Sequence, residues 1–560
     1  MLRLFRWQIL LAALGILLVA GLLAQFALLR ETVAIPIRGG VYTEGVIGTP
    51  QLLHPLLATS DADRDISGLL FEGLSTLLPD GSIQPALAEK WEASPQGTVY
   101  TCTLRSDIYW HDGEPVTTVD VLFTLNLLRS PDFPTTSPLQ ALWVRIQAQA
   151  LDDRRIRFLL ERPYAPFLSY TTLPLLPAHL LQKVPPADLP SSPFFLHPIG
   201  TGPFRFVRLE EGEDGVPTLE LEANPLYYRG LPYLEGVHFR FYRDEGVLVE
   251  ALLQGEVEGA FGLSRAALER LSGRSDLVAY RAYLQAYNIL FLNTRSPFLG
   301  DRRVRQALAL GLDRRALVQG LEEEVFPANG PISPISWAYK PDLPAFPYDP
   351  GRAAELLEEA GWLDQNHDGV RERDIRSLEL VLLTRDVPPE RVALANRIKQ
   401  QLASLGVSIR VAVVPPETFR RRLAERDFDL LLYGWGQLGR DPDEFVLWHS
   451  SQTGPEGSNL SSLQNETIDR LLEQGRTLLD RDLRIPIYWQ FQEEFIQEVP
   501  AIPLYYPVYT YILPARLHGV ELAPFNEPGE RFRSITGWYL KTQVQTRLRS
   551  VAAPRYGRER

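Results

Sequence analysis

Residues 378–384, LELVLLT, open an alternation of strand and helix patterns in this chain. The run is rich in Leu and predicts a buried strand, and residues 388–405 then repeat apolar side chains at helical spacing. Residues 407–413 alternate as a second strand, a short helix follows a double proline, and residues 428–433, FDLLLY, predict a third strand. Strand–helix–strand units of this kind build parallel sheets with right-handed crossovers, so the pattern predicts an α/β fold.

The loop after the third strand, residues 434–439 (GWGQLG), is a candidate binding loop, because ligands of such sheets lie outside the carboxyl ends of the strands. Its glycines also fit the dinucleotide fingerprint, which requires the last glycine to open a helix that receives the pyrophosphate. Here we expect the next helix to open only at Asp441-Pro442, with Asp441 as its N-cap. An acidic helix start repels phosphate, so no nucleotide cofactor is expected.

Two further motifs resemble metal sites. Asp364-x-Asn366-x-Asp368-Gly369 matches the first half of a calcium loop, but Ile375 stands where the bidentate Glu of such a loop belongs. The sequence 111–114, HDGE, contains the turn dipeptide Asp-Gly and has no second histidine at metal spacing. We interpret both as polar turns and expect no metal and no cofactor.

No catalytic motif stands out in the chain. Neither a Gly-x-Ser-x-Gly nucleophile elbow nor a His-Glu-x-x-His zinc motif occurs. The single cysteine, Cys102, excludes an intramolecular disulfide and a multi-cysteine metal site. The sequence therefore predicts a protein that is not an enzyme.

The amino terminus predicts membrane insertion. Residues 7–29 form an uncharged, mostly apolar run of 23 residues, preceded by Arg3 and Arg6 and closed by Arg30. At 1.5 Å per residue this run reaches about 34 Å, enough for the hydrocarbon core of a bilayer. The leading arginines place the amino terminus in the cytoplasm and the rest of the chain outside. We favour an uncleaved anchor over a cleaved signal peptide, because a small-x-small cleavage site is only weakly matched.

The charge distribution argues against nucleic acid as a partner. The 560 residues carry a net charge of −12, but residues 541–560 hold six Lys/Arg against one Glu. Without the basic ends, residues 31–540 contain 48 basic and 68 acidic groups and have a net charge of −20. Such a body lacks the positive charge that contacts phosphate backbones, whereas the basic tail suits an anionic lipid surface.

A series of motifs spans almost the whole body and resembles one family. The series comprises Phe71-Glu72-Gly73-Leu74, residues 85–92 (PALAEKWE), residues 110–116 (WHDGEPV), Gly200-Thr201-Gly202-Pro203-Phe204, Asn224-Pro225-x-Tyr227-Tyr228, residues 304–308 (VRQAL) and residues 501–505 (AIPLY). In this order they resemble the extracytoplasmic solute-binding proteins of family 5, the peptide- and nickel-binding components of ABC transporters. The resemblance covers residues 38–540.

The resemblance implies a periplasmic-binding-protein-like α/β fold of type II. Three lobes with mixed sheets and a hinged ligand cleft are expected after one N-terminal transmembrane or signal helix. The expected division is an anchor (1–35), lobe I (36–70, 199–292 and 505–540), lobe II (71–198), lobe III (293–504) and a basic tail (541–560). The chain would close on its ligand by hinge motion.

The resemblance also implies a function. We expect an extracytoplasmic, membrane-anchored monomer that captures a peptide-like or other polar organic solute and delivers it to the permease subunits of an ABC importer. Two alternatives stay open: a sensory or adaptor protein without transport, and a binder of sugars, opines or metal chelates. A neighbouring permease gene would favour transport.

The expected ligand contacts lie in two groups. Trp435 and Tyr433 would stack on the ligand, and the backbone of Gly434 and Gly436 would bond it in strand fashion. The opposite lobe would be lined by Thr201, Tyr505 and the loop around Asp61, and Trp337 is a further candidate contact.

One position departs from the family pattern. Peptide-binding members carry an aspartate three residues past the loop tryptophan, which pairs with the terminal ammonium of the peptide, and this chain has Leu438 there. Because a buried ammonium without a counter-ion costs several kcal/mol, we expect a ligand without that ammonium, or a cation held by Asp441, Asp61 or Asp63.

Overall fold

The computed structural model describes residues 14–19 and 30–548, apart from gaps at 79–80, 136–137, 213, 284–285, 320, 322–323, 345, 388–389, 436–440 and 525–526. Residues 14–19 are helical, and the rest of the apolar run predicted as an anchor lies outside the described residues. Within the described part of the chain, no helix has the length and apolar character needed to cross a membrane.

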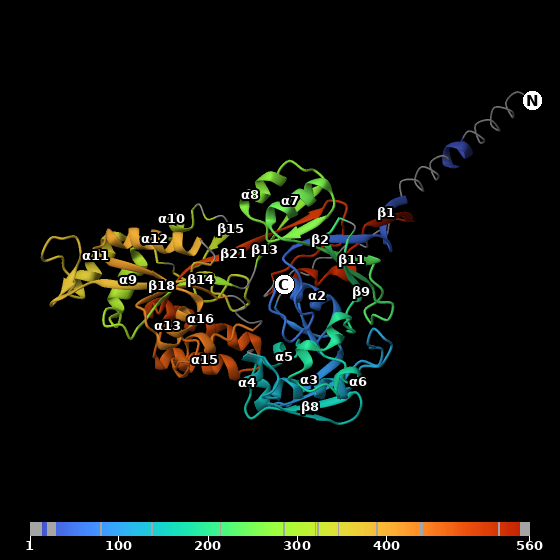
Figure 1. Cartoon of the computed structure of the whole chain (residues 1–560), viewed down its shortest axis with the longest axis horizontal. Coiled ribbons are helices and arrows are strands. Elements are labelled where there is room, and N and C mark those ends of the chain that lie inside the picture. Colours follow the sequence, from blue (N-terminus) through green and yellow to red (C-terminus); the bar gives the residue numbers. More distant parts are fainter. Residues whose placement is uncertain are drawn as a thin grey trace, which may run out of the picture.

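A twelve-stranded mixed sheet runs through the molecule (Figure 1). Its main path is β19-β18-β20-β14-β21-β12-β2-β11-β10-β9, and β13 and β15 also pair with β21. The strands are β2 (Val41–Ile47), β9 (Phe204–Glu211), β10 (Pro217–Ala223), β11 (Gly236–Tyr242), β12 (Gly259–Phe261), β13 (Leu277–Tyr283), β14 (Tyr287–Leu292), β15 (Glu324–Pro327), β18 (Glu379–Thr384), β19 (Ser408–Val413), β20 (Leu430–Trp435) and β21 (Ala501–Pro514).

Strand β21 connects the two halves of this sheet. It is 14 residues long; residues 501–505 pair with β14, and residues 508–514 pair with β13 and β12. The expected boundary between lobes III and I, at 504/505, falls inside this strand. Any movement of one half of the sheet relative to the other would therefore involve β21.

The strand–helix alternation predicted from residue 378 onward is confirmed. Strands β18 and β19 are parallel, β18 and β20 are parallel, and α12 (Glu390–Ala403) and α13 (Pro416–Glu425) form the crossovers. Along β20, Leu430 and Leu432 join one apolar core while Leu431 joins another, because successive side chains of a strand point to opposite faces. Helices therefore cover both faces of this part of the sheet.

Figure 1 shows α12 and α13 on one side of the molecule. The other side holds α2 (Asp61–Leu70), α3 (Thr118–Arg129), α5 (Phe167–Tyr170) and α6 (Ala178–Leu181). In the range of lobe III the remaining elements are α9 (Arg302–Leu310), α10 (Arg314–Val318), α11 (Pro350–Glu359), β16 (Glu372–Arg373), β17 (Arg376–Ser377), α14 (Phe445–Trp448), η3 (Ser450–Gln452), α15 (Glu466–Thr477) and α16 (Arg481–Glu498). Helix α11 begins with Pro350 and is capped by Asp349, as its sequence predicts.

The range of lobe II contains a separate antiparallel sheet in the order β5-β6-β8-β7. Strands β5 and β6 pair as a hairpin around residues 94–97, and the thiol of Cys102 on β6 is buried, which raises its pKa. The elements are β3 (Ser75–Leu77), β4 (Ile83–Pro85), β5 (Ala88–Ala93), β6 (Val99–Leu104), α3 (Thr118–Arg129), α4 (Pro138–Arg145), β7 (Gln147–Ala150), β8 (Arg155–Leu159), α5 (Phe167–Tyr170), α6 (Ala178–Leu181), η1 (Leu189–Ser191) and η2 (Pro193–Leu196).

The range of lobe I adds few helices to the large sheet. They are α2 (Asp61–Leu70), α7 (Glu245–Gln254), α8 (Arg265–Leu271), η4 (Pro528–Phe532) and η5 (Ile535–Gly537). Its apolar core is continuous with that of lobe II, and α7 and α8 cover a smaller core against β12 and β21.

A two-stranded ribbon joins the ends of the described chain. Strand β1 (Arg30–Ile37) pairs antiparallel with β22 (Lys541–Leu548), in a register that sets Arg30 opposite Leu548. The ribbon thus combines the end of the segment predicted as an anchor with the first eight residues of the predicted tail. Its two strands are more than 500 residues apart in sequence, so no local pattern indicates this pairing.

Candidate functional site

The predicted binding loop begins at the carboxyl end of β20. There Tyr433, Gly434 and Trp435 pair with residues 289, 288 and 287 of β14. On the other side of β20, the register with β18 ends at Leu431. Among the described strands, residues 433–435 therefore have no ladder partner along that edge. Gly436 and Leu438 lie outside the described residues, and so does the side chain of Trp435.

Gly434 lies beneath two polar side chains. A Cβ atom at this position would be 2.5 Å from Arg391 Nη2 and 2.9 Å from Asn288 Oδ1. Asn288 pairs with Gly434 on one side and with Tyr505 of β21 on the other. The backbones of these three residues thus form a row across three adjacent strands, and glycine lets Arg391 and Asn288 approach it.

Two arginines border the same strand end. Tyr433 stacks on Phe419 with ring centroids 5.8 Å apart, and the guanidinium of Arg391 lies 5.8 Å from the Tyr433 ring. On the other side of the stack, the guanidinium of Arg385 lies 5.8 Å from the Phe419 ring. The described surroundings of the loop are therefore cationic and aromatic.

Asp441 is bound to Arg484. Arg484 Nη1 donates to Asp441 Oδ2 at 2.7 Å and Nη2 donates to Oδ1, so both carboxylate oxygens face one guanidinium. Arg484 is buried, donates to Gly475 O and Tyr488 Oη as well, and lies 5.0 Å from the Trp337 ring. The prediction that Asp441 caps a helix is wrong: the helix, α14, begins at Phe445. A bidentate charged pair is stronger than an N-cap bond.

Asp443 joins the ranges of lobes II and III. Its Oδ2 accepts from Arg476 Nη2 at 2.8 Å, from Arg476 Nε at 3.0 Å and from Tyr164 Oη at 3.1 Å. The backbone N–H of Ala165 donates to Arg476 O at 2.7 Å. Tyr164 and Ala165 come from lobe II, whereas Asp443 and Arg476 come from lobe III, so this cluster fastens the two together in the present conformation.

Glu444 is a buried acid beside the same segment. Its Oε2 accepts from Trp448 Nε1 at 3.0 Å, and burial raises its pKa to about 8, with a smaller contribution from the charge of Asp443. The hydroxyl of Tyr287 is fully buried and has no hydrogen-bond partner among the described residues. Glu444 therefore carries a proton at neutral pH in this structure.

Thr201 lies in a loop that is held by His111. The backbone N–H of Gly200 donates to His111 Nδ1 at 3.1 Å, and His111 Nε2 lies 3.1 Å from Gly202 O. Burial lowers the pKa of His111 to about 4, so the ring is neutral and donates through Nε2. Both ring nitrogens are used, which agrees with the interpretation of residues 111–114 as structural.

Asp61 and Thr201 lie at opposite ends of α2. The loop of Thr201 packs against the carboxyl end, where Gly202 N donates to Leu70 O, and Asp61 is the first residue of the helix. Nine residues of helix separate them by about 14 Å. Asp61 is exposed and pairs with Arg64, while Asp63 accepts from Gln51 N and Leu52 N.

Tyr505 and Trp337 are both positioned by packing. Tyr505, predicted to lie on the opposite lobe, is 3 % exposed and packs into the same apolar core as residues of β14, β18 and β20. Trp337 packs against the Tyr488 ring at 5.8 Å and against the guanidinium of Arg481 at 5.2 Å. The structure thus brings Trp337 close to Asp441 through Arg484, and it brings Tyr505 close to Gly434 through Asn288.

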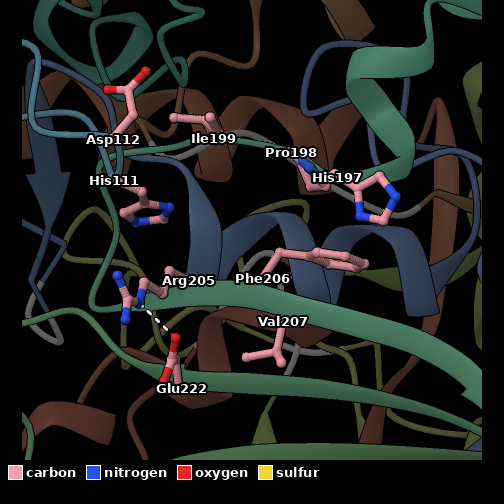
Figure 2. Close-up of a pocket in the computed structure, with 9 residues that line it drawn as sticks. All are labelled: His111, Asp112, His197, Pro198, Ile199, Arg205, Phe206, Val207 and Glu222. Atoms are coloured by element: carbon pink, nitrogen blue, oxygen red, sulfur yellow. Dashed lines mark ion pairs between the residues drawn. The ribbon is translucent and has the colours of Figure 1, made fainter.

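A pocket of about 380 Å³ lies elsewhere, between β9, β10 and the segments 111–112 and 197–199 (Figure 2). Its charged groups already have partners: Arg205 Nε lies 2.7 Å from Glu222 Oε1, and Asp112 pairs with His179 outside the pocket. The pocket is distinct from the loop after β20, and none of the predicted contacts lines it.

Sequence reasoning missed Asn288, Arg391, Arg476 and Arg484. Asn288 lies 146 and 217 positions from Gly434 and Tyr505, and each of the three arginines lies 33 or 43 positions from the site residue that it approaches. Spacing in the sequence therefore carries no signal for these contacts. Arg385 and Arg391, which flank the start of α12, could have been noticed as two arginines beyond the carboxyl end of β18.

The chain is similar to proteins of one family over most of its length. Residues 82–457, well over half of the chain, match the family model described as "Bacterial extracellular solute-binding proteins, family 5 Middle". The chain is 28 % identical over 519 residues to the oligopeptide-binding protein AppA of Bacillus subtilis, which covers 91 % of this chain and 93 % of AppA. It is 26 % identical over 535 residues to di/tripeptide-binding protein 2 of Pseudomonas aeruginosa, covering 90 % and 96 %.

Solved structures are similar to this chain over most of its length. AppA from Bacillus subtilis in complex with a nonapeptide is similar with a TM-score of 0.70 at 28 % identity, covering 90 % of this chain and 100 % of that chain. NikZ from Campylobacter jejuni in complex with Ni(L-His) gives 0.72 at 27 % identity, covering 89 % and 99 %. The mixed α/β fold is therefore shared as a whole.

Proposed function

Because the chain belongs to the bacterial extracellular solute-binding proteins of family 5, we propose that it captures a peptide-like or other polar organic solute and delivers it to an ABC permease. The family consists of substrate-binding proteins rather than enzymes. Its relatives include binders of oligopeptides and of a nickel–histidine complex, so the family tolerates ligands of different chemistry.

The open edge of β20 carries this proposal. Residues 433–435 continue past the end of the ladder with β18, and an extended ligand can bond their backbone as an added strand. Tyr433 and Trp435 flank Gly434 on this strand, where they can pack against the ligand, and Tyr505 follows on β21. The solute would lie between lobes I and III, with Thr201 on the side of lobe I and closure about β14 and β21.

The charges around this edge favour a ligand that presents a carboxylate. Arg391 lies over Gly434 and Arg385 lies over Phe419, so the charges nearest to this strand end are positive. Asp441 is bound by Arg484, Asp61 by Arg64 and Asp63 by backbone N–H groups. Leu438 supplies no counter-ion. We therefore expect that the protein binds its ligand without recognising a free terminal ammonium. A carboxylate of the ligand can pair with the guanidinium of Arg391.

Isothermal titration with one tetrapeptide in three forms tests this ligand chemistry. We expect N-acetylation to change the Kd by less than about threefold, and C-terminal amidation to weaken binding about tenfold or more, equivalent to about 1.4 kcal/mol. Arg391→Gln should weaken binding of the unmodified peptide, and amidation should then cause no further change in the Kd. Arg420→Gln, an exposed arginine on α13, is the matched control. Binding that is lost on acetylation and unchanged on amidation would contradict the proposal.

We also propose that the protein is a monomer held at the outer face of the cytoplasmic membrane by residues 1–35. The apolar run 7–29 and the arginines before it support this location. The register of the ribbon runs from Lys541 opposite Ile37 to Leu548 opposite Arg30, so the tail leads back to the end of the apolar run. The tail would then lie at anionic lipid headgroups.

A further inference from the structure

The turn after α11 forms a closed loop. Leu363 and Glu372 form an antiparallel bridge in which Leu363 N donates to Glu372 O at 3.0 Å and Glu372 N donates to Leu363 O at 2.7 Å. This bridge closes residues 364–371 and sets Glu372 beside Asp364. The sequence pattern of a calcium loop requires a Glu at position 375, which is Ile in this chain. The fold instead places Glu372 beside Asp364.

Three carboxylates meet in this loop. Asp364, Asp368 and Glu372 each place one oxygen within 4.8 Å of the others, and among the described residues none of the three has an ion-pair partner. Like charges at this separation repel one another. A bound cation would remove this repulsion.

Two of the oxygens are shielded from solvent and have no donor. Asp364 Oδ2 accepts from Gly369 N at 3.1 Å, and Glu372 Oε2 accepts from Gln365 N at 3.0 Å. The other oxygen of each group, Asp364 Oδ1 and Glu372 Oε1, is fully buried and receives no hydrogen bond in the described structure. Buried acceptors without a partner are rare in native proteins, and a bound water or ion is one explanation for them.

We propose that Asp364, Asp368 and Glu372 bind a calcium ion. Carboxylate oxygens are the ligands of hard divalent cations. The irregular geometry of a surface loop suits Ca²⁺ better than Mg²⁺, which requires nearly ideal octahedral coordination. The bidentate Glu of a complete calcium loop is missing, because Ile375 stands at that position and is exposed. The site therefore belongs with weak extracellular calcium sites, with a Kd of about 10⁻⁴ to 10⁻³ M.

The ion would stabilise lobe III rather than take part in solute capture. In Figure 1, α11 lies at the opposite end of the molecule from β1. The loop joins the end of α11 to the hairpin β16–β17, which leads directly into β18. A bound ion would fasten this connection in an extracytoplasmic compartment.

Terbium luminescence of the full-length protein tests the site, because the buried Trp362 lies two residues from Asp364 and can sensitise Tb³⁺. After removal of metal by a chelator, we expect saturable luminescence on excitation at 280 nm, displaced by Ca²⁺ at millimolar concentration. Asp364→Asn combined with Glu372→Gln should weaken Tb³⁺ binding at least tenfold. Both substitutions keep an oxygen that can accept the existing hydrogen bonds, so the loop should stay folded.

Asp374→Asn is the matched control, since Asp374 lies in the adjacent turn with φ 59°, a conformation that Asn adopts readily. Ca²⁺ should raise the Tm of the wild type and of this control by about 2 °C and leave the double variant unchanged. Equal Tb³⁺ binding and an equal Tm increase in the double variant would mean an adventitious ion elsewhere and would overturn the proposal. Absence of saturable binding to the wild type would also overturn it.

Discussion

Replacing Arg531 with Met should lower the free energy of unfolding by about 3–5 kcal/mol. Arg531 is 2 % exposed and bonds two buried carboxylates: its Nη1 and Nη2 donate to Asp65 at 2.7 and 2.6 Å, and Nη2 donates to Glu44 Oε1 at 2.9 Å. Tyr511 Oη adds a hydrogen bond to Glu44 at 2.8 Å. Without the guanidinium, two acids stay buried with no counter-ion. Urea unfolding, with hydrogen exchange of β2 and α2, measures the loss.

Two further variants separate charge from packing. Arg265→Ala removes an arginine from an exposed pair with Glu269 and should change stability by less than about 1 kcal/mol. Combining Arg531→Met with Glu44→Gln and Asp65→Asn should recover much of the loss, because no buried charge then lacks a partner. A single Arg531→Met variant as stable as the wild type would refute this account of the lobe I core.

Replacing Glu444 with Gln should stabilise the protein at alkaline pH. Burial raises the pKa of Glu444 to about 8, against 4.5 for a solvated glutamate, and the groups facing it are Asp443, Tyr287 and Tyr506. Because the folded pKa is raised, the contribution of Glu444 is full below pH 4.5 and is lost as the pH rises to 8. Above pH 8 the variant should be more stable by on the order of 5 kcal/mol.

The test is how the difference in free energy of unfolding between the wild type and Glu444→Gln changes with pH. Free energies of unfolding of wild type and Glu444→Gln, taken from urea titrations between pH 4.5 and 9, should coincide at the acid end and diverge steadily above pH 5. Glu417→Gln, a control on an exposed residue of α13, should show no such divergence. A difference that is independent of pH would mean that Glu444 is ionised in the folded protein throughout.

The local part of the fold could be read from the sequence, and the long-range part could not. The order β18-α12-β19-α13-β20 follows from apolar spacing within 60 residues, since the period of a helix or strand is visible in a short window. The partners of Asn288 are Gly434 and Tyr505, which lie 146 and 217 positions away. Such pairing depends on the closure of the whole chain, and no pattern in either segment encodes it.

In the candidate site, too, the local features could be predicted from the sequence and the long-range contacts could not. The position of Tyr433 and Gly434 at a strand end was predictable, because the strand and the glycines are adjacent in sequence. Asp441 resembles a helix cap in sequence, but Arg484, 43 residues later, competes successfully for its carboxylate. Glu372 could have been found only by allowing for the bridge that folds it back onto Asp364.

Native mass spectrometry of the full-length protein, purified in detergent and incubated with an extract of peptides and small polar solutes, tests the central claim most directly. The wild type should carry a single non-covalent solute that disappears in Trp435→Ala. Trp489→Ala, which removes a tryptophan on the surface of α16, should keep it. Equal occupancy in Trp435→Ala, or no bound solute in the wild type, would contradict solute capture at the end of β20.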